Sequence, residues 1–564
     1  MPVVKTPPRT ILVAPNRLKR ILAMNDLRQL SALIIDPSPG MRSSLHGMLT
    51  TCGLTKIEHA ISSGNAIRQL QAHSFDLILC EYDLGEGQDG QQLLEDLRHN
   101  KIITLSTLVF MVTAERSFEK VVSAAELAPN DYLLKPFAAD ALLERIGRAV
   151  EKRAAFSALY ALMANGNWQG AIDACVTGEA LKNRYLSDFK RLRAELHVTL
   201  GEPQLAEPIY AELVALRAIA WARLGLAKTL FLQNKLPESV HMLSDLVAEN
   251  PKFMDAYDWL AKAHAASGQL PDAKTVLENA VAISPHAVRR LRKLGEVALE
   301  SGDVLAAEKA FQKVVSKARY SEFRDPEDHV QLVRTLIQKG DTTQAATIIR
   351  DLDKSLAGSV KTKACHAISS AMLFAQTGDE ARAASELTKA VEACRNPIGL
   401  STDMKMTLAA NCLEHHMDEG ASEIMLDVMN NAASPAAHEK AVQLFQQAGR
   451  TDLAERVASE SRRVVVDLVS AGADKARIGD YRGAVTLMME AVAKLPENPQ
   501  VVFNAAVAVL KYLENLGWDE RLGAQARSLI DTARRLDSAN PRLGSLTALY
   551  QKIQSIRSVT GVAR

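Results

Sequence analysis

Two hydrophobic patterns divide the chain near residue 153. Between Ser31 and that point, short apolar runs alternate with stretches whose apolar residues recur at helical spacing. The runs predict strands over 32–35, 57–60, 75–80, 108–112 and 131–134. The intervening stretches predict helices over 41–51, 65–73 and 91–99, near 118–127, and from Ala138 onward. Short apolar strands separated by helices are typical of a parallel sheet that is covered on both faces.

Polar residues stand where four of these strands end. Asp36 follows the first strand, and Glu81 follows the core of the third. Thr113 follows the fourth strand, and Lys135 follows the fifth. Ligands bind at the carboxyl ends of parallel strands. A lone carboxylate at a strand end is usually a helix cap, but four complementary groups predict a shared polar pocket.

This first segment resembles the receiver domain of bacterial two-component response regulators over about residues 31–153. The resemblance rests on the motifs 75–80 (FDLILC), 89–90 (DG), 111–115 (MVTAE) and 131–137 (DYLLKPF). It implies a flavodoxin-like α/β domain with a five-stranded parallel sheet. It also implies a cis peptide bond before Pro136.

The resemblance assigns expected roles to the residues at the strand ends. Glu81 occupies the phosphoacceptor position, and Asp36, Thr113 and Lys135 line the receiver pocket. Tyr132 occupies the position of the switch aromatic, on the face where receivers bind partners or form dimers. The plainer interpretation of Tyr132 is a half-buried aromatic in a strand, and the two interpretations are compatible.

The chain departs from the receiver pattern at two positions. Pro37 replaces the second residue of the acidic pair, and Glu81 stands where the family has Asp. Mg²⁺ requires near-octahedral oxygen ligands, and Pro37 has no side-chain oxygen. We therefore expect Mg²⁺ to bind weakly or not at all, with Asp36 and Glu81 as its ligands if it binds.

The same departures predict a domain that is phosphorylated poorly or not at all, because phosphoryl transfer to a carboxylate needs a metal ion. The longer Glu81 side chain is expected to pair with Lys135 and to accept a hydrogen bond from Thr113. It would then hold the domain near its phosphorylated shape. The alternative is a pocket retained only for folding.

A 34-residue period replaces the strand signals after residue 153. It relates Ser239 to Ala273 and Ala307, and Leu243 to Leu277 and Phe311. The period and its small residues resemble the tetratricopeptide repeat. The resemblance implies an all-α superhelical solenoid over 154–540, clearest over 220–319, with a capping helix and tail over 541–564.

The concave surface of such a solenoid is lined mainly by the first helix of each pair. Fitted to the repeat, the predicted groove residues are Lys228, Asp258, Lys262, Arg289, Arg292 and Glu296. The basic run 289–293 favours an acidic peptide as partner, although a solvated charged face is the commoner explanation. A clamp for a C-terminal carboxylate is not predicted, because Leu224 and Trp259 do not fit its pattern.

Composition and charge narrow the class of protein. The 564 residues are 47% hydrophobic and 24% charged, which excludes a mostly disordered chain. The net charge of +1 gives no nucleic-acid footprint, although residues 1–30 carry +5 and residues 31–150 carry −5. The basic residues 1–30 are predicted to be a disordered extension. Six cysteines without a CxxC pair indicate reduced thiols, and with the lack of a long apolar run they predict a cytoplasmic protein.

These observations predict a regulatory adaptor, with a degenerate receiver that controls or docks a solenoid binding protein partners. No P-loop, nucleophile elbow or zinc-protease motif is present, so an enzyme is not expected. A receiver-mediated homodimer is a further expectation, whereas nucleic-acid and membrane partners are not. The alternatives are a conventional Mg²⁺-dependent, phosphorylation-switched regulator and a constitutive scaffold with an inert receiver. A third is an RNA- or membrane-associated protein that uses residues 1–23 and the basic run.

Overall fold

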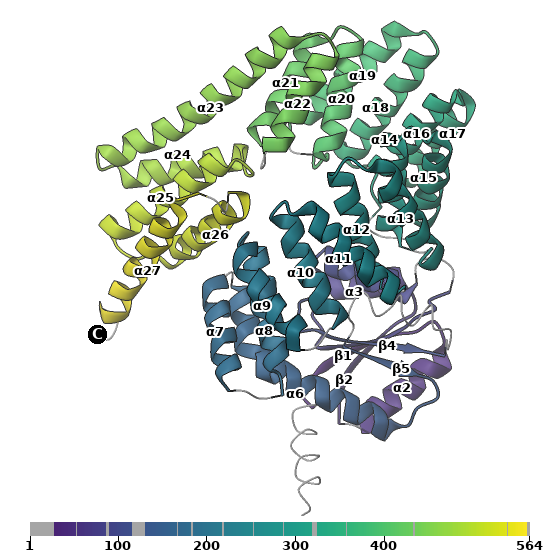
Figure 1. Cartoon of the computed structure of the whole chain (residues 1–564), viewed down its shortest axis with the longest axis vertical. Coiled ribbons are helices and arrows are strands. Elements are labelled where there is room, and N and C mark those ends of the chain that lie inside the picture. Colours follow the sequence, from purple (N-terminus) through teal and green to yellow (C-terminus); the bar gives the residue numbers. More distant parts are fainter. Residues whose placement is uncertain are drawn as a thin grey trace, which may run out of the picture.

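A computed structural model describes residues 28–560 except 52, 86–88, 115–129, 166, 182–183, 217–218, 252, 286, 319–323, 357, 397, 432–434 and 538–539. Its N-terminal part is a five-stranded parallel sheet of order β2-β1-β3-β4-β5 (Figure 1). The strands are β1 (Ser31–Ile35), β2 (Lys56–Ala60), β3 (Leu77–Glu81), β4 (Leu108–Thr113) and β5 (Asp131–Leu134). The helices are α2 (Pro39–Thr51), α3 (Ser63–Ala72), α4 (Gly90–His99) and α6 (Ala139–Ala164).

Alternate residues of the sheet enter two hydrophobic cores on its opposite faces. In β1, Leu33 and Ile35 pack in the core that α3 and α4 cover. Ala32 and Ile34 pack in the core that α2 and α6 cover. Because both faces are buried, β1 is a continuous apolar run rather than an alternating one. This burial leaves the strand ends as the place where polar side chains gather.

The predicted α/β fold is confirmed. All five predicted strands form, and the peptide bond between Lys135 and Pro136 is cis. The third strand begins at Leu77 rather than Phe75, and the Asp76 carboxylate just before it accepts hydrogen bonds from the backbone N–H and the hydroxyl of Ser31, each 3.0 Å long. The helix predicted near 118–127 falls on residues outside those that the structure describes.

Helix α6 belongs to both parts of the molecule. Leu142 and Ile146 are buried in the core of the sheet, and Phe156 and Leu159 are buried in the first core of the helical part. The predicted boundary at residue 153 therefore lies inside one continuous helix of 26 residues. Arg153 itself pairs with Asp76, with 3.0 Å between Nη1 and Oδ1.

The rest of the described chain is a run of antiparallel helices. They are α7 (Trp168–Ala180), α8 (Leu186–Thr199), α9 (Pro203–Leu216), α10 (Ala220–Leu232), α11 (Leu236–Glu249), α12 (Met254–Ala266), α13 (Leu270–Ile283), α14 (Val288–Glu300), α15 (Val304–Ala318), α16 (Glu327–Lys339), α17 (Thr342–Leu356), α18 (Val360–Gln376), α19 (Glu380–Cys394), α20 (Thr402–Glu414), α21 (Asp418–Asn430), α22 (Pro435–Gln447), α23 (Thr451–Arg477), α24 (Tyr481–Lys494), α25 (Pro499–Leu516), α26 (Glu520–Leu536) and α27 (Leu543–Thr560). The predicted all-α solenoid is thus confirmed.

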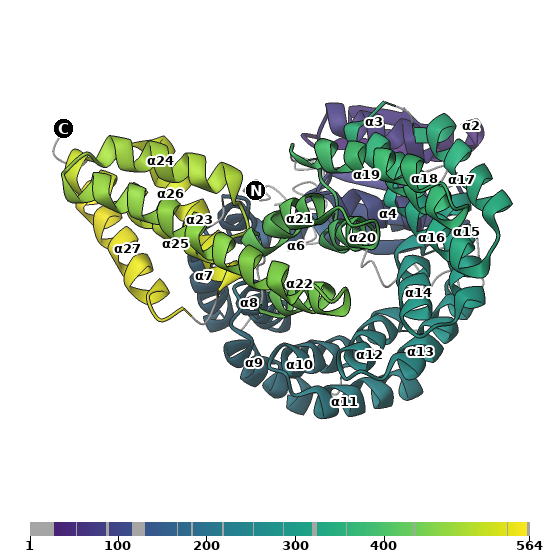
Figure 2. The same ribbon diagram turned by 90° about the horizontal axis from the view of Figure 1, so that it is seen from above.

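The helices form an arc with two layers. Figure 2 shows α10, α12 and α14 on the inner side of the arc and α11 and α13 on the outer side. Ala261, Ala273 and Ala280 are almost fully buried where neighbouring helices meet, as their small side chains predict. Gly268 and Gly302 follow inner helices with φ of 76° and 80°, a conformation that residues with a Cβ atom rarely adopt.

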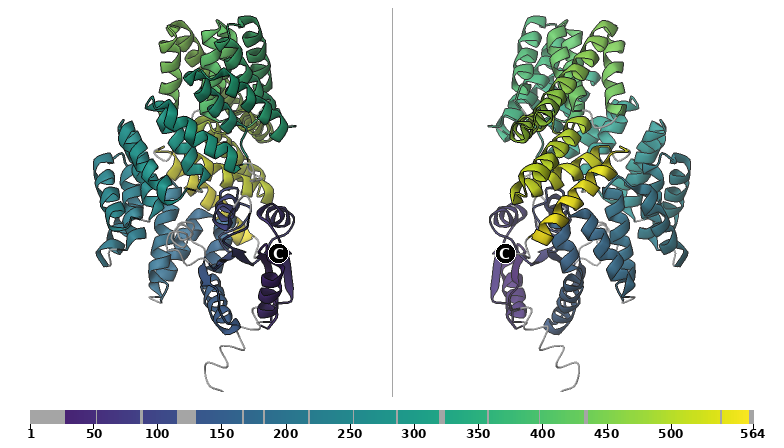
Figure 3. Two further views of the ribbon diagram at one scale, coloured as in Figure 1. Left: turned by 90° about the vertical axis from the view of Figure 1, so that its right-hand side faces the viewer. Right: turned by 90° about the vertical axis from the view of Figure 1, so that its left-hand side faces the viewer.

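The last helices return to the first helix pair. The solenoid rises away from the sheet and descends again, so that α26 lies beside the first helices of the solenoid (Figures 1 and 3). The Trp168 side chain at the start of α7 lies close to the Asp531 carboxyl of α26 and lowers its pKa. The segment Thr451–Arg477 forms the single long helix α23. In the described part of the chain, no helix is long and apolar enough to cross a membrane.

The contact between α7 and α26 predicts a pH-dependent stability. Burial raises the pKa of Asp531 to about 7, although Arg534 and Arg527 lower it. A raised folded-state pKa means that the carboxylate destabilises the fold progressively as the pH rises from about 4 to 7. We therefore expect Asp531→Asn to raise the melting temperature most at pH 8.5, by less at pH 5.5 and hardly at all at pH 3.5. A difference between variant and wild type that does not change with pH would contradict this account.

Candidate functional site

The carboxyl ends of four strands meet at one edge of the sheet. Ile35 is in register with Cys80, which places Asp36 beside Glu81. Glu81 is in register with Val112, and Thr113 with Leu134, the residue before Lys135. The polar residues that the sequence places at the strand ends therefore occupy neighbouring positions.

Lys135 joins the two carboxylates of this edge. Its Nζ lies 3.1 Å from Asp36 Oδ2 and also pairs with Glu81 Oε2. The side chains are 14%, 3% and 11% exposed for Lys135, Asp36 and Glu81 respectively. One ammonium thus serves two nearly buried carboxylates, and removal of Lys135 would leave two like charges close together.

The remaining oxygens of both carboxylates accept hydrogen bonds from backbone amides. Asp36 Oδ1 accepts from the N–H of Ser38 at 2.8 Å. Glu81 Oε1 accepts from the N–H groups of Tyr82 and Asp83 at 2.9 and 3.3 Å. The Glu81 carboxylate is therefore held by its own turn on one side and by Lys135 on the other. Such charge-assisted bonds fix an anion at the acceptor position.

Thr113 completes this edge from β4. It is buried, and its carbonyl accepts a hydrogen bond from the backbone N–H of Lys135 at 2.8 Å. The hydrogen bond that we expect from Thr113 to Glu81 stays a prediction. Glu115, the last residue of the fourth-strand motif, lies outside the described residues.

The side chains of this pocket fit a Mg²⁺ site poorly. Pro37 stands next to Asp36 and offers no side-chain ligand. Asp36 and Glu81 each use one oxygen on Lys135 and the other on backbone amides. Mg²⁺ would have to compete with the Lys135 ammonium for both carboxylates and would lack the ligand that Pro37 cannot supply. We therefore derive no step that uses a metal ion here.

Tyr132 is half-buried on β5, three residues before Lys135. Its ring packs against the core that α3 and α4 cover. Arg145 of α6 donates to the carbonyl of Tyr132 at 2.8 Å and to Asp131 Oδ1 at 2.7 Å. Arg145 therefore ties the edge strand β5 to α6. A role of Tyr132 as a switch or in a dimer stays a prediction.

The predicted groove residues lie on the inner helices α10, α12 and α14, where ion pairs engage three of them. Asp258 forms a two-bond pair with Arg290, with N–O distances of 2.7 and 2.9 Å. Arg292 forms a second such pair with the buried Asp328, at 2.6 and 2.8 Å. Glu296 pairs with Lys293 at 3.0 Å. Two of the three arginines of the basic run, Arg290 and Arg292, thus link successive inner helices.

The other predicted groove residues are placed differently. Arg289 is exposed at the start of α14. Lys228 and Lys262 lie beside aromatic rings, with the Nζ atoms 5.3 and 4.4 Å from the centroid of Trp259. The contact of Trp259 with two lysines was not predicted from the sequence, in which Trp259 stands out only as a mismatch to a carboxylate clamp. The shared spacing of Lys228 and Lys262, 34 residues apart, is the signal that points to a common site.

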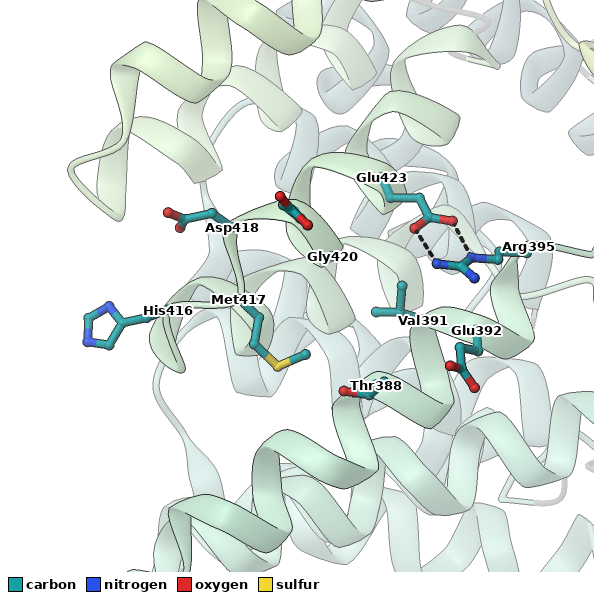
Figure 4. Close-up of a pocket in the computed structure, with 10 residues that line it drawn as sticks. Thr388, Val391, Glu392, Arg395, His416, Met417, Asp418, Gly420 and Glu423 are labelled. Atoms are coloured by element: carbon teal, nitrogen blue, oxygen red, sulfur yellow. Dashed lines mark hydrogen bonds and ion pairs between the residues drawn. The ribbon is translucent and has the colours of Figure 1, made fainter.

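A hollow lies further along the solenoid. It has a volume of about 980 Å³ and is lined from α16, α18, α20 and α22. A smaller hollow of about 420 Å³ lies between α19 and α21. Figure 4 shows Arg395 and Glu423 joined at its rim, with His416 pointing away. The two hydrogen bonds from Arg395 to Glu423, 2.9 and 3.3 Å long, connect the end of α19 to α21.

Comparisons with known proteins identify both parts of the chain. Residues 32–147 match the model of the response regulator receiver domain, and residues 224–287 and 260–322 match the model of the tetratricopeptide repeat. The chemotaxis protein CheY of Pseudomonas aeruginosa is 30% identical over 120 residues, which cover 21% of this chain and 95% of the relative.

Two further similarities were found. Chemotaxis protein CheY-3 of Vibrio cholerae is 27% identical over 125 residues, covering 22% of this chain and 95% of the relative. The crystal structure of the C-terminal part of a TPR repeat-containing protein from Cytophaga hutchinsonii is 16% identical, with a TM-score of 0.35. That similarity covers 42% of this chain and 95% of the solved chain.

The close approach of Gly90 to the strand end predicts a sensitive position. A Cβ atom on Gly90 would lie 2.3 Å from the carbonyl oxygen of Glu81 and 3.0 Å from Met111 Cε. We expect Gly90→Ala to destabilise the domain by about 1–3 kcal/mol. Faster hydrogen exchange in the peptide 77–85 would report this loss.

Gly147 provides the matched control, since a Cβ atom there meets no atom within 4 Å. Gly147→Ala is expected to leave exchange in 77–85 unchanged and to stabilise α6 by about 1 kcal/mol or less. Equal exchange rates in the two variants would refute the steric argument.

Proposed function

The chain belongs to the response regulator receiver family through residues 32–147, and from this premise we propose that it is a signalling adaptor working without a phosphorylation cycle. The receiver domain is followed by tetratricopeptide repeats, which support a role in protein–protein interaction. In this proposal, the receiver sets the binding state of the solenoid, and Glu81 takes the place of the phosphoryl group.

The arrangement around Lys135 carries the proposal. Its ammonium contacts both Asp36 and Glu81, and the other oxygen of each carboxylate accepts from backbone N–H groups. The Glu81 carboxylate extends one methylene further than aspartate would, so its negative charge lies farther from β3, toward Lys135. A carboxylate that is held at this position from both sides supports a receiver that stays in one conformation.

Helix α6 supports a direct effect of the receiver on the solenoid. It begins four residues after Lys135 and continues into the first helix pair of the solenoid. Lys152 of α6 pairs with Asp188 of α8 at 2.7 Å, and the next residue, Arg153, pairs with Asp76 beside the sheet. A change at β5 would therefore move a single rigid element that both parts share.

The proposal describes a binding protein rather than an enzyme, acting in the cytoplasm without a metal cofactor. Partner choice is assigned to the solenoid, and regulation is assigned to the receiver. The half-buried Tyr132 face is kept as the candidate dimer surface. The following experiments distinguish this proposal from two alternatives. One is a conventional phosphorylated regulator, and the other is a scaffold with an inert receiver.

Phosphorylation is tested with acetyl phosphate and Mg²⁺ on the full chain. We expect the wild type to gain no phosphoryl group, because Lys135 already neutralises the acceptor and Pro37 cannot bind the metal. The double variant Pro37→Asp/Glu81→Asp is expected to form an acyl phosphate on residue 81 with release of acetate. Intact-mass spectrometry measures the gain.

The variant Pro37→Asp/Glu81→Asn provides the matched control, since it restores the metal ligand without an acceptor. It should remain unlabelled. Labelling of the wild type at the rate of an ordinary receiver would reject the proposal in favour of a phosphorylated regulator.

Control of the solenoid is tested by comparing the proteins that the full chain captures from its own cells. Glu81→Gln removes the charge of the acceptor position, and we expect the yield of captured partners to change at least severalfold. Glu144→Gln, an exposed carboxylate of α6, is the control and should capture the wild-type set. Identical sets for all three proteins would identify the chain as a scaffold with an inert receiver.

A further inference from the structure

Two lysines on the inner face of the solenoid approach one indole ring. Lys228 and Phe231 lie one turn apart on α10, and Trp259 and Lys262 lie one turn apart on α12. Figure 2 places both helices on the inner side of the arc. We call these four residues the lysine–tryptophan site.

The ammonium groups of the site lie over the aromatic faces. Lys262 Nζ lies 4.4 Å from the centroid of the Trp259 ring and 5.0 Å from that of Phe231. Lys228 Nζ lies 5.3 Å from the Trp259 centroid. The two rings meet edge to face with centroids 5.5 Å apart. The electron-rich ring faces orient the two cations, but a ring carries no net charge and neutralises neither.

Carboxylates near the site are already engaged or lie too far away to form an ion pair. Asp258 is paired with Arg290, and Glu195 with Arg191. Asp255 is the remaining acidic neighbour of Lys228, and burial raises the pKa of its carboxyl. Within the described residues, neither Lys228 nor Lys262 has a carboxylate oxygen within 4 Å.

The neighbouring inner-face cations increase this excess of positive charge. Burial lowers the pKa of Lys228, and burial together with Lys293 and Lys228 lowers the pKa of Lys262. Lys293 is partly neutralised by Glu296. An incoming anion would relieve the repulsion between these ammonium groups, as an opposite charge favours the charged form of a lysine.

We propose that the lysine–tryptophan site binds side-chain carboxylates of an acidic protein segment. The inference rests on the proposed adaptor function and names the chemistry of its partner. The residues of the site lie within 224–287, one of the stretches that match the tetratricopeptide repeat. Each ammonium keeps N–H donors for a carboxylate oxygen while its other side rests on the ring.

Carboxylates fit this site better than a nucleic-acid backbone. The faces of Trp259 and Phe231 are occupied by the lysines, so that bases cannot stack on them in the usual way. Asp255 and Asp258 lie close by on α12 and would repel a continuous row of phosphates. An acidic peptide can place single carboxylates at the two lysines and turn neutral residues toward these aspartates.

The test measures binding of a fluorescein-labelled peptide of alternating glutamate and leucine to the full chain by fluorescence anisotropy. Both ends of the peptide are blocked, so that only side-chain carboxylates are present. We expect Lys228→Gln and Lys262→Gln each to raise the Kd about fivefold to tenfold, and the effect to shrink at high salt. The same peptide with glutamine in place of glutamate should bind at least tenfold more weakly.

Lys313→Gln is the matched control, because Lys313 is an exposed lysine of the outer helix α15. It should leave the Kd unchanged. The melting temperature of each variant provides the folding control, and the two site variants are expected to keep the wild-type value or exceed it, since each removes a repelled charge.

Four results would overturn the proposal, and the first three concern the blocked peptides and oligouridine. They are equal binding of the glutamate and glutamine peptides, an unchanged Kd in both site variants, and tighter lysine-dependent binding of oligouridine than of the glutamate peptide. Recovery of binding only with a free C-terminal carboxylate would also reject it, because the site would then read a chain end. None of these results depends on Glu81, so the inference and the proposed function fail separately.

Discussion

The continuous helix α6 is the constraint on which the arrangement of this protein depends. Its first turns bury Leu142 and Ile146 under the sheet, and its last turns bury Phe156 and Leu159 in the solenoid. A helix whose two ends are fixed in different cores removes the freedom that a loop would give. The ion pairs that Lys152 and Arg153 form on either side of the junction add directional restraints to this apolar anchoring.

This constraint gives the Lys135 pocket its importance. The pocket is polar and almost buried, and the two carboxylates share one cation. Breaking a buried charge cluster of this kind is costly, because it leaves a buried charge without a partner. The geometry that is fixed includes the end of β5, and β5 leads into α6 within a few residues. Local electrostatics at the sheet edge and the orientation of the solenoid are thus properties of one structural unit.

Much of the fold and of the receiver pocket could be predicted from the sequence. The strand ends were predictable because parallel strands bring Asp36, Glu81 and Lys135 to one edge whatever the details of packing. The period of 34 residues predicted the inner helices, since each repeat buries the same positions. The partners of Arg290 and Arg292 were not predictable. Their acidic partners lie in neighbouring repeats, and only the reach of each side chain decides which pairs form.

Other features escaped prediction for a similar reason. Helical periodicity indicates which face of α6 is apolar, but it does not mark where that face passes from one core to another. The contact between Trp168 and Asp531 joins opposite ends of the solenoid, so it depends on the accumulated curvature of every repeat between them. Small rotations at each helix pair add up, and no local pattern records their sum.

Because α6 is continuous, the number of residues between the sheet and the solenoid also determines how one part is rotated relative to the other. An α-helix turns by about 100° per residue, so one inserted residue would swing the entire solenoid around the axis of α6. About seven residues, two full turns, would restore the original phase at a greater separation. Insertions or deletions in α6 therefore preserve the relative orientation of the sheet and the solenoid only at a few lengths. The number of residues in α6 therefore sets the rotation of the solenoid relative to the sheet.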